Sequence, residues 1–319
     1  MSGPVSPVDT TEARPVTGLP GMEVSEGRRT AVGGVPVTRS LPRARRRTVG
    51  AWCFIDHFGP ADVPEAAMRV GPHPHVGLHT VTWVFDGEVV HHDSLGHEQL
   101  IKPGQLNLMT AGRGVAHAEE TPPGASGALH GLQLWVAQPD ATRQGPAAFE
   151  HHPTLPQAEV GPLVATVLVG ELAGARSPAR SDTPLVGADL VVTGAATLPL
   201  DPTFEHGLLV VDGPLTVDGR LVEPGAFAYL APGRAELGLT PGTSSGSGSG
   251  RALLLGGAPF GEPVLMWWNF VARSREEMVE ARQEWEGESD RFGPVESHLG
   301  RIPAPPPLWD RPGMQPPGK

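Results

Sequence analysis

Short apolar runs with alternating polar positions begin at Ala51 and continue along most of the chain. Each run is bounded by Gly, Pro or Asp. Examples are AWCFIDHF, HTVTWVF and GLQLWV in the first half, and LVATVLV, GLLVV and ALLLGG in the second. Short β-rich runs separated by closely spaced turn residues are typical of sandwiches and barrels. The pattern therefore predicts an all-β protein.

The two halves repeat one order of strands and turns. Val84–Gly87 ends a strand with an acidic-Gly turn, and Ile101–Met109 then supplies a Pro-Gly turn and a further strand. Val210–Gly213 and Val222–Leu230 repeat this order downstream. Internal duplication is the simplest explanation. We therefore expect two similar β-barrels.

One helix is predicted near the C-terminus. Ser274 followed by Glu277 is a capping-box pattern, and Met278, Ala281 and Trp285 then recur on one helical face. The sequence thus divides into four expected segments: a poorly ordered N-terminal segment at 1–25, a first barrel at 26–155, a second barrel at 156–273, and the helix with a Pro-rich tail at 274–319.

The bulk composition excludes some classes of function. The formal net charge of −11 argues against direct nucleic-acid binding, which needs clustered positive charge. An arginine-rich stretch at 39–47 is interpreted as a solvated loop. Cys53 is the only cysteine, so no intrachain disulfide can form and a reducing compartment is expected. Because no leader-like or membrane-spanning apolar run is present, we expect a cytoplasmic protein with no membrane partner.

Histidines are concentrated in the first repeat, where 11 of the 13 fall between His57 and His152. Two pairs of potential ligands stand at positions i and i+2: His73 with His75, and His117 with Glu119. In an extended strand such residues share one face, roughly 6.6 Å apart along the strand. Facing strands inside a barrel would bring both pairs together.

Three imidazoles and one carboxylate suit a divalent transition ion such as iron, while Mn, Co, Ni, Cu and Zn remain open. A single His-x-His pair is more often a surface or core feature, but here the spacing occurs twice in one repeat. The second repeat aligns Gly238 and Thr240 with His117 and Glu119, so we expect one metal-binding barrel and one scaffold. Metal affinity should fall as the pH drops through the range near 6.5 where histidine titrates.

Four stretches of the chain resemble the pirin family of the cupin superfamily: HPHVGLHTVTWVFDGEVVHHDSLGHEQ, PGQLNLMTAGRGVAHAEE, HGLQLWV and FGEPVLMWWNFVARSREEM. The resemblance extends from about Arg39 to the helix after Ser274. It implies a bicupin of two double-stranded β-helix (jelly-roll) barrels. It also implies iron, or a similar ion, held in the first barrel by His73, His75, His117 and Glu119.

Three further residues need interpretation beside this resemblance. His79 occupies the place of the usual Glu of the first cupin motif, which is not generally a ligand in pirins. We expect it to pack beside its strand, with a contact near the metal as the alternative. His91 and Asp93 share one strand face, and hydrogen bonding is preferred over catalysis for them. Cys53 is interpreted as a small buried hydrophobe.

The resemblance also implies an activity. Members of the family show quercetin dioxygenase activity, so the leading interpretation is a metal-dependent oxygenase acting on a flavonol-like aromatic substrate and O2, with Glu119 as ligand and general base. The rival interpretation is a metal- or redox-sensing protein that regulates a protein partner without essential turnover. A third is an isomerase or hydrolase on a cupin frame. Fold-level analogy cannot separate them.

Overall fold

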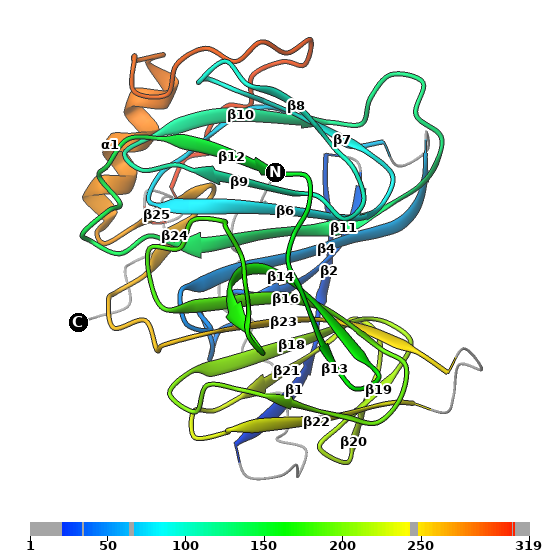
Figure 1. The fold of residues 1–319 in the computed structure, drawn as a ribbon. Helices are drawn as coiled ribbons and strands as arrows, with labels where there is room; N and C mark the ends of the chain where they lie inside the picture. The colour runs from blue at the N-terminus through cyan, green and yellow to red at the C-terminus, as the bar shows by residue number, and fades with distance from the viewer. Residues whose placement is uncertain (1–20, 34, 64–66, 243–247, 308, 310–319) are drawn as a thin grey trace.

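The computed structural model describes residues 21–33, 35–63, 67–242, 248–307 and 309 (Figure 1). Two sheets form the first half. The larger sheet has the order β12 (Ala148–His152), β9 (Leu106–Thr110), β6 (Leu78–Asp86), β11 (Gly127–Ala137), β4 (Trp52–Val63), β3 (Val35–Leu41), β2 (Arg28–Val32). The smaller has the order β5 (Arg69–His75), β10 (Val115–Glu120), β7 (Val89–Asp93), β8 (Glu98–Ile101).

The second half follows the same plan. Its larger sheet has the order β1 (Met22–Glu26), β21 (Ala226–Leu230), β18 (Glu205–Asp212), β23 (Gly250–Gly257), β16 (Leu185–Val192), β14 (Leu163–Leu172), β13 (Gln157–Val160), with β15 (Ala175–Arg176) beside β14. Its smaller sheet has the order β17 (Ala196–Pro199), β22 (Glu236–Pro241), β19 (Leu215–Val217), β20 (Arg220–Val222). The prediction of an all-β chain with two similar jelly-roll barrels is confirmed.

The first described strand departs from the sequence prediction. A poorly ordered segment was expected through residue 25, of which residues 1–20 lie outside the described residues. Met22–Glu26 instead forms β1, which pairs in antiparallel orientation with β21 of the second barrel. Met22 lies opposite Leu230 and is buried in the second core. The expectation is wrong for residues 22–25, because backbone pairing and one buried side chain order a segment whose composition is largely polar.

A shared core joins the two barrels. Trp52 and Trp83 of the first barrel pack with Leu185, Leu209 and Leu253 of the second. The Trp83 indole also donates to Asp189 across the interface at 3.1 Å. Side chains of β4, β6 and β11 therefore pack in this shared core, while Phe54 and Asp56 of β4 and Trp135 of β11 line the interior of the first barrel.

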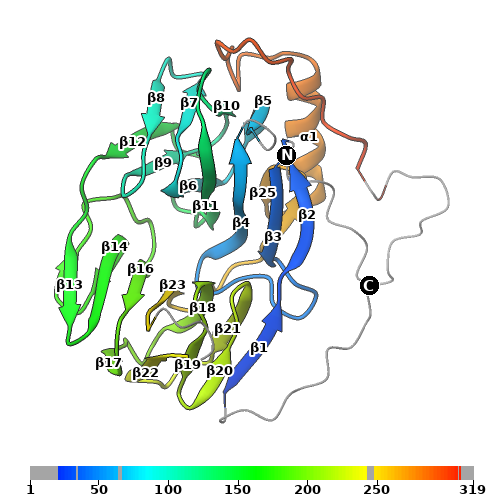
Figure 2. The same cartoon turned by 90° about the vertical axis from the view of Figure 1, so that its right-hand side faces the viewer.

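The segment after β23 returns to the first barrel. It contains β24 (Leu265–Trp267), β25 (Phe270–Ala272) and α1 (Arg275–Glu286). Met278, Ala281 and Trp285 of α1 are buried and pack in one cluster with Ala116 of β10. The Ser274 hydroxyl accepts from the Glu277 N–H at 3.2 Å, so the predicted helix start is confirmed. Figure 2 shows α1 beside β25 and β5.

Aliphatic side chains fill the interior of the second barrel. Leu239 of β22 pairs with β17 and β19 in the way that His117 of β10 pairs with β5 and β7. Leu237 and Leu239 are buried in the second core, whereas Thr240 is exposed. The sequence alignment of Gly238 and Thr240 with the ligand positions is therefore wrong by one residue. Within the described residues, both clusters of potential ligands lie in the first barrel.

The first prediction concerns this scaffold core. Leu239→Ala should lower the free energy of unfolding by about 2–5 kcal/mol, because the truncation leaves a cavity in a packed core. Urea unfolding monitored by circular dichroism in the presence of chelator would measure the loss. Metal content per folded molecule, measured without chelator, should stay at the wild-type level. A fall in metal content would contradict a purely structural role for this barrel.

Candidate metal centre

Two neighbouring strands supply the candidate ligands. His73 and His75 lie on β5, and His117 and Glu119 lie on β10, with His117 directly opposite His73 in the antiparallel pair. The register shifts between His117 and Glu119, which marks a β-bulge. The alternation of side chains on each strand directs both members of each pair to the barrel interior, as the i, i+2 spacing requires.

The structure brings the three histidines to one point. The Nε2 atoms of His75 and His117 are 3.0 Å apart, and the ring centroids of His73 and His117 are 4.4 Å apart. Each ring offers one nitrogen to a group whose ligand atoms all lie within 4.8 Å of one another. All three side chains are buried. This cluster could hold a metal ion.

Hydrogen bonds orient the first two rings. Nδ1 of His73 is 2.9 Å from the Gly71 carbonyl oxygen, and Nδ1 of His75 is 3.0 Å from the Asn269 carbonyl oxygen. A carbonyl oxygen only accepts hydrogen bonds, so each Nδ1 carries the hydrogen. In the neutral ring Nε2 is then bare. Two lone pairs therefore point into the cluster, which is how metal-binding histidines are prepared for coordination.

Burial keeps these rings neutral. Burial, with a contribution from the neighbouring histidines, lowers the pKa of His75 to about 3 and those of His73 and His117 well below the usual value of histidine. The neutral imidazole is the form that binds a metal ion. At neutral pH no proton need be displaced from these nitrogens.

Glu119 lies in a second, overlapping group with His91 and His117, whose ligand atoms are also within 4.8 Å of one another. Its Oε1 accepts a hydrogen bond from the Thr82 hydroxyl at 3.2 Å. Burial raises the pKa of this carboxyl group. The structure thus places Glu119 beside His117, but not within the tight group that His117 forms with the two histidines of β5.

His91 contacts a member of the histidine cluster directly, which the sequence did not indicate. Its Nδ1 is 3.3 Å from Nδ1 of His117, and its Nε2 is 3.1 Å from Oδ2 of Asp93. Asp93 Oδ1 also accepts from the backbone of Leu95 and His97. Burial alone would raise the pKa of Asp93, but hydrogen bonds from His91 and His97 lower it below its usual value. In the sequence, the only indication of these contacts is that His91 and Asp93 share one strand face.

A small cavity adjoins the histidines. Aromatic and aliphatic side chains form most of its wall, with polar groups from Asp56, Gln133 and Glu119. Asp56 is held by a buried ion pair with Arg39 at 2.6 and 2.7 Å. The cavity volume is about 40 Å³. It is therefore mostly apolar with a few fixed polar groups, as ligand sites usually are, but much smaller.

His79 and Cys53 lie outside the cluster. Nδ1 of His79 is 2.9 Å from the Thr110 hydroxyl, and its Nε2 is 3.2 Å from Asp182, which precedes the second barrel's β16. His79 thus packs between the two halves and not beside the ligands, in agreement with the preferred interpretation. Cys53 is fully buried, and burial raises the pKa of its thiol to about 12. Neither residue is placed to act at the cluster.

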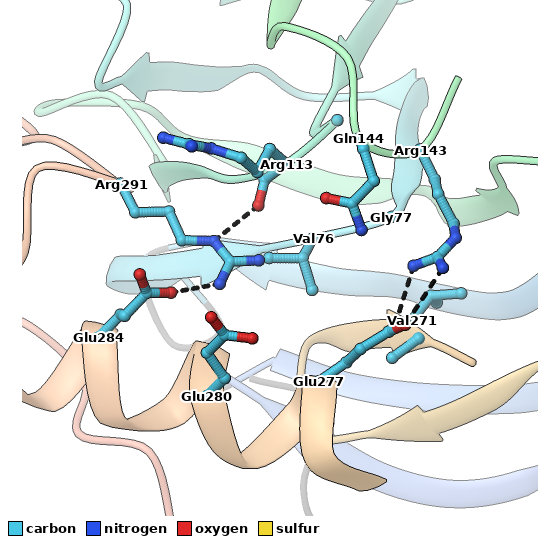
Figure 3. A pocket seen from close by; sticks show the side chains of 12 residues that line it. Val76, Gly77, Arg113, Arg143, Gln144, Val271, Glu277, Glu280, Glu284 and Arg291 are labelled. Atoms are coloured by element: carbon cyan, nitrogen blue, oxygen red, sulfur yellow. Dashed lines mark hydrogen bonds and ion pairs between the residues drawn. The ribbon is translucent and has the colours of Figure 1, made fainter. Parts of the chain in front are cut away.

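A separate polar groove lies on the outside of the first barrel. It runs between α1 and the turns at 112–113 and 143–144, with a volume of about 140 Å³ (Figure 3). Arg143 donates to Glu277 at 2.8 and 3.1 Å, and Arg291 pairs with Glu284. Among the described residues that line it, none is a histidine or cysteine. The histidine cluster in the barrel is therefore the stronger candidate centre.

The described chain contains no helix long and apolar enough to cross a membrane.

Two family models match the chain. The model described as Pirin matches residues 34–136, and the model described as Pirin C-terminal cupin domain matches residues 186–293. The first range contains the whole histidine cluster. The second covers most of the aliphatic barrel together with α1.

Relatives match both barrels. A Pseudomonas aeruginosa protein named "Putative quercetin 2,3-dioxygenase" is 48% identical over 87% of this chain and 87% of its own. A pirin-like protein of Caulobacter vibrioides is 36% identical over 82% of this chain and 92% of its own. The crystal structure of a quercetin 2,3-dioxygenase from Acinetobacter baumannii is 41% identical, with a TM-score of 0.86, and the match covers 92% of this chain and 97% of that one. This chain belongs to the pirin family of bicupin proteins.

Proposed function

We propose that the protein is a metal-dependent oxygenase of the quercetin 2,3-dioxygenase type, in which His73, His75, His117 and Glu119 hold one divalent transition ion, iron in preference to others. The observation that carries the proposal is the convergence of three buried imidazoles, two of which have bare Nε2 atoms fixed by backbone carbonyls. The names of the relatives at 48% and 41% identity support the activity.

Glu119 is the proposed general base. Its buried carboxylate has a raised pKa, so it is a stronger proton acceptor than an exposed carboxylate. Oε1 lies 3.2 Å from the Thr82 hydroxyl, which is also 2.9 Å from Gln133 Oε1 and so shares its one hydrogen between the two oxygens. The carboxylate therefore keeps lone pairs for the proton of a substrate hydroxyl. A bound ion would orient the substrate anion and oxygen and couple electron transfer between them. The protein's own part is to accept the proton and to exclude water.

The cavity wall fits an aromatic compound that carries hydroxyl groups. Phe54 and Trp135 stack at 4.1 Å in the wall, and Asp56 and Gln133 offer polar atoms to hydroxyls. A volume of about 40 Å³ is well below the several hundred Å³ of typical ligand sites. Binding of a flavonol therefore requires the wall to move. Its aliphatic side chains come from the β2–β3 side, with Val32 and Val35, and from the β5 side, with Met68 and Val70.

The same small cavity favours a second function. A site that admits little more than water and small ligands would suit a metal- or redox-sensing protein, whose ion changes the surface presented to a protein partner. The net charge of −11 favours a partner with a basic face. Oxygen uptake by the iron-loaded protein on a panel of flavonols and catechols separates the two. Absence of uptake, together with metal-dependent binding of a partner, would replace the oxygenase proposal.

His117→Ala should abolish metal binding, because His117 belongs to both groups of potential ligands. Elemental analysis of protein purified without chelator measures the loss. His206→Ala is a matched control, since His206 is equally buried but stands in the second barrel. Equal metal content in the His117 variant and the wild type would contradict the proposed centre.

Glu119→Gln should lower turnover much more than it lowers metal content. The amide retains an oxygen for coordination but cannot accept a proton, so some metal should remain while turnover falls on the order of 100-fold or more. Steady-state oxygen consumption, normalised to measured metal content, checks this. Turnover per metal ion equal to that of the wild type would exclude Glu119 as the base.

The pH range of metal release should lie lower than the sequence indicated. Burial holds the histidine pKa values below 6.5, with His75 at about 3, so the neutral, ligand-competent rings persist as the pH falls through 6.5. Protons compete only as the pH approaches these lowered values. Occupancy at pH 5.5 under a competing chelator of known pH dependence should equal that at pH 7.5. Half-release centred near pH 6.5 would contradict the buried site.

A further inference from the structure

A chain of hydrogen bonds leads away from His117 on the side opposite His75. His117 Nδ1 contacts His91 Nδ1 at 3.3 Å, and His91 Nε2 contacts Asp93 Oδ2 at 3.1 Å. All three side chains are buried, and Phe149 stacks on the His91 ring at 4.5 Å. His117, unlike the two histidines of β5, has a histidine in place of a backbone carbonyl at its Nδ1. Its hydrogen position is therefore not fixed by that contact alone.

Asp93 determines which ring nitrogen of His91, and hence of His117, carries the hydrogen. Its ionised carboxylate only accepts hydrogen bonds, so His91 must carry its hydrogen on Nε2. The Nδ1 of a neutral His91 is then bare and can only accept from His117 Nδ1. We propose that His91 and Asp93 are positioning residues that fix His117 with its hydrogen on Nδ1 and its Nε2 free for the metal. This inference rests on the proposed metal centre, and neither residue is assigned as a ligand.

The loop after β7 keeps Asp93 in place independently of His91. Oδ1 of Asp93 accepts from the backbone N–H groups of Leu95 and His97 at 2.9 and 3.0 Å, while Oδ2 lies 3.1 Å from His91 Nε2 and 3.0 Å from His97 Nδ1. An asparagine at this position can keep its oxygen on the two N–H groups. Its NH2 group would then face His91 Nε2 and donate to it, so the hydrogen of His91 would move to Nδ1 and oppose that of His117. Asp93→Asn thus reverses the hydrogen-bond order and preserves the loop.

The experiment measures Zn²⁺ affinity by chelator competition. Asp93→Asn should weaken binding by about 10- to 100-fold, the usual effect of removing a partner of a metal-binding histidine. His97→Ala is the matched control, because the half-exposed His97 contacts both carboxylate oxygens of Asp93 and makes no hydrogen bond to His91 or His117 among the described residues. It should bind zinc like the wild type. Wild-type affinity in Asp93→Asn would overturn the inference.

A double-substitution cycle tests whether Asp93 acts through His91. In the background of His91→Phe, which preserves an aromatic ring against Phe149, Asp93→Asn should change zinc affinity less than about 2-fold, because no ring remains to be oriented. An equal loss in both backgrounds would show that Asp93 supports the loop only, and would overturn the proposed role.

The tautomer of His91 can be measured directly by NMR. A purely structural role of Asp93 in the loop predicts no change in this tautomer. Ring ¹⁵N shifts of histidine-labelled, zinc-loaded protein should place the His91 hydrogen on Nε2 in the wild type and on Nδ1 in Asp93→Asn. The same tautomer in both proteins would overturn the inference.

If the wild type binds no metal, or His117→Ala retains it, the proposal of a metal centre is itself wrong. If metal binding needs His117 but not Asp93, only the positioning role fails.

Discussion

The bare Nε2 atoms of His73 and His75 face the His117 ring inside the first barrel, and the surrounding structure is arranged to hold them there. The pairing of β5 with β10 sets His73 opposite His117, and two backbone carbonyls keep the lone pairs of His73 and His75 directed inward. In a dry interior adjacent lone pairs repel, and charging a ring is disfavoured by burial. A bound cation that accepts these lone pairs removes their repulsion, and no ring then has to be protonated. The donor set therefore fits a metal ion better than it fits a hydrogen-bonded core.

The first barrel does not complete this arrangement from its own sequence. The carbonyl that holds His75 belongs to Asn269, which follows the second barrel in the chain and lies 194 residues away. The backbone of Val271 donates to the Val76 carbonyl at 3.1 Å, so β25 is bound to the end of β5. α1 then packs over Ala116 on the outer side of β10. The segment after β23 thus supports both ligand strands, which explains why it returns to the first barrel.

The sequence predicts which candidate ligands share a strand face better than it predicts the residues around them. The period of two places His73 with His75, and His117 with Glu119, on common faces, and the capping pattern at Ser274 locates the helix. Propensity does not predict β1, because its order comes from pairing with β21, about 200 residues away. The alignment of Gly238 with His117 is wrong because turns tolerate insertion, whereas the inward position of Leu239 follows from strand pairing. The contact of His91 with His117 likewise depends on β7 lying beside β10.

Strand β6 connects the candidate site to the second barrel. Thr82 points inward and donates to Glu119, while Trp83, its neighbour in sequence, points outward and donates to Asp189 of the second barrel. Arg251 holds the same carboxylate at 2.5 and 2.9 Å, so the Trp83 indole has a fixed acceptor. The second barrel therefore holds β6 at the residue next to Thr82, whose hydroxyl contacts both Glu119 and Gln133. Packed aliphatic side chains fill the second barrel, and it contacts β6 at Trp83, the residue next to the one that contacts the proposed general base.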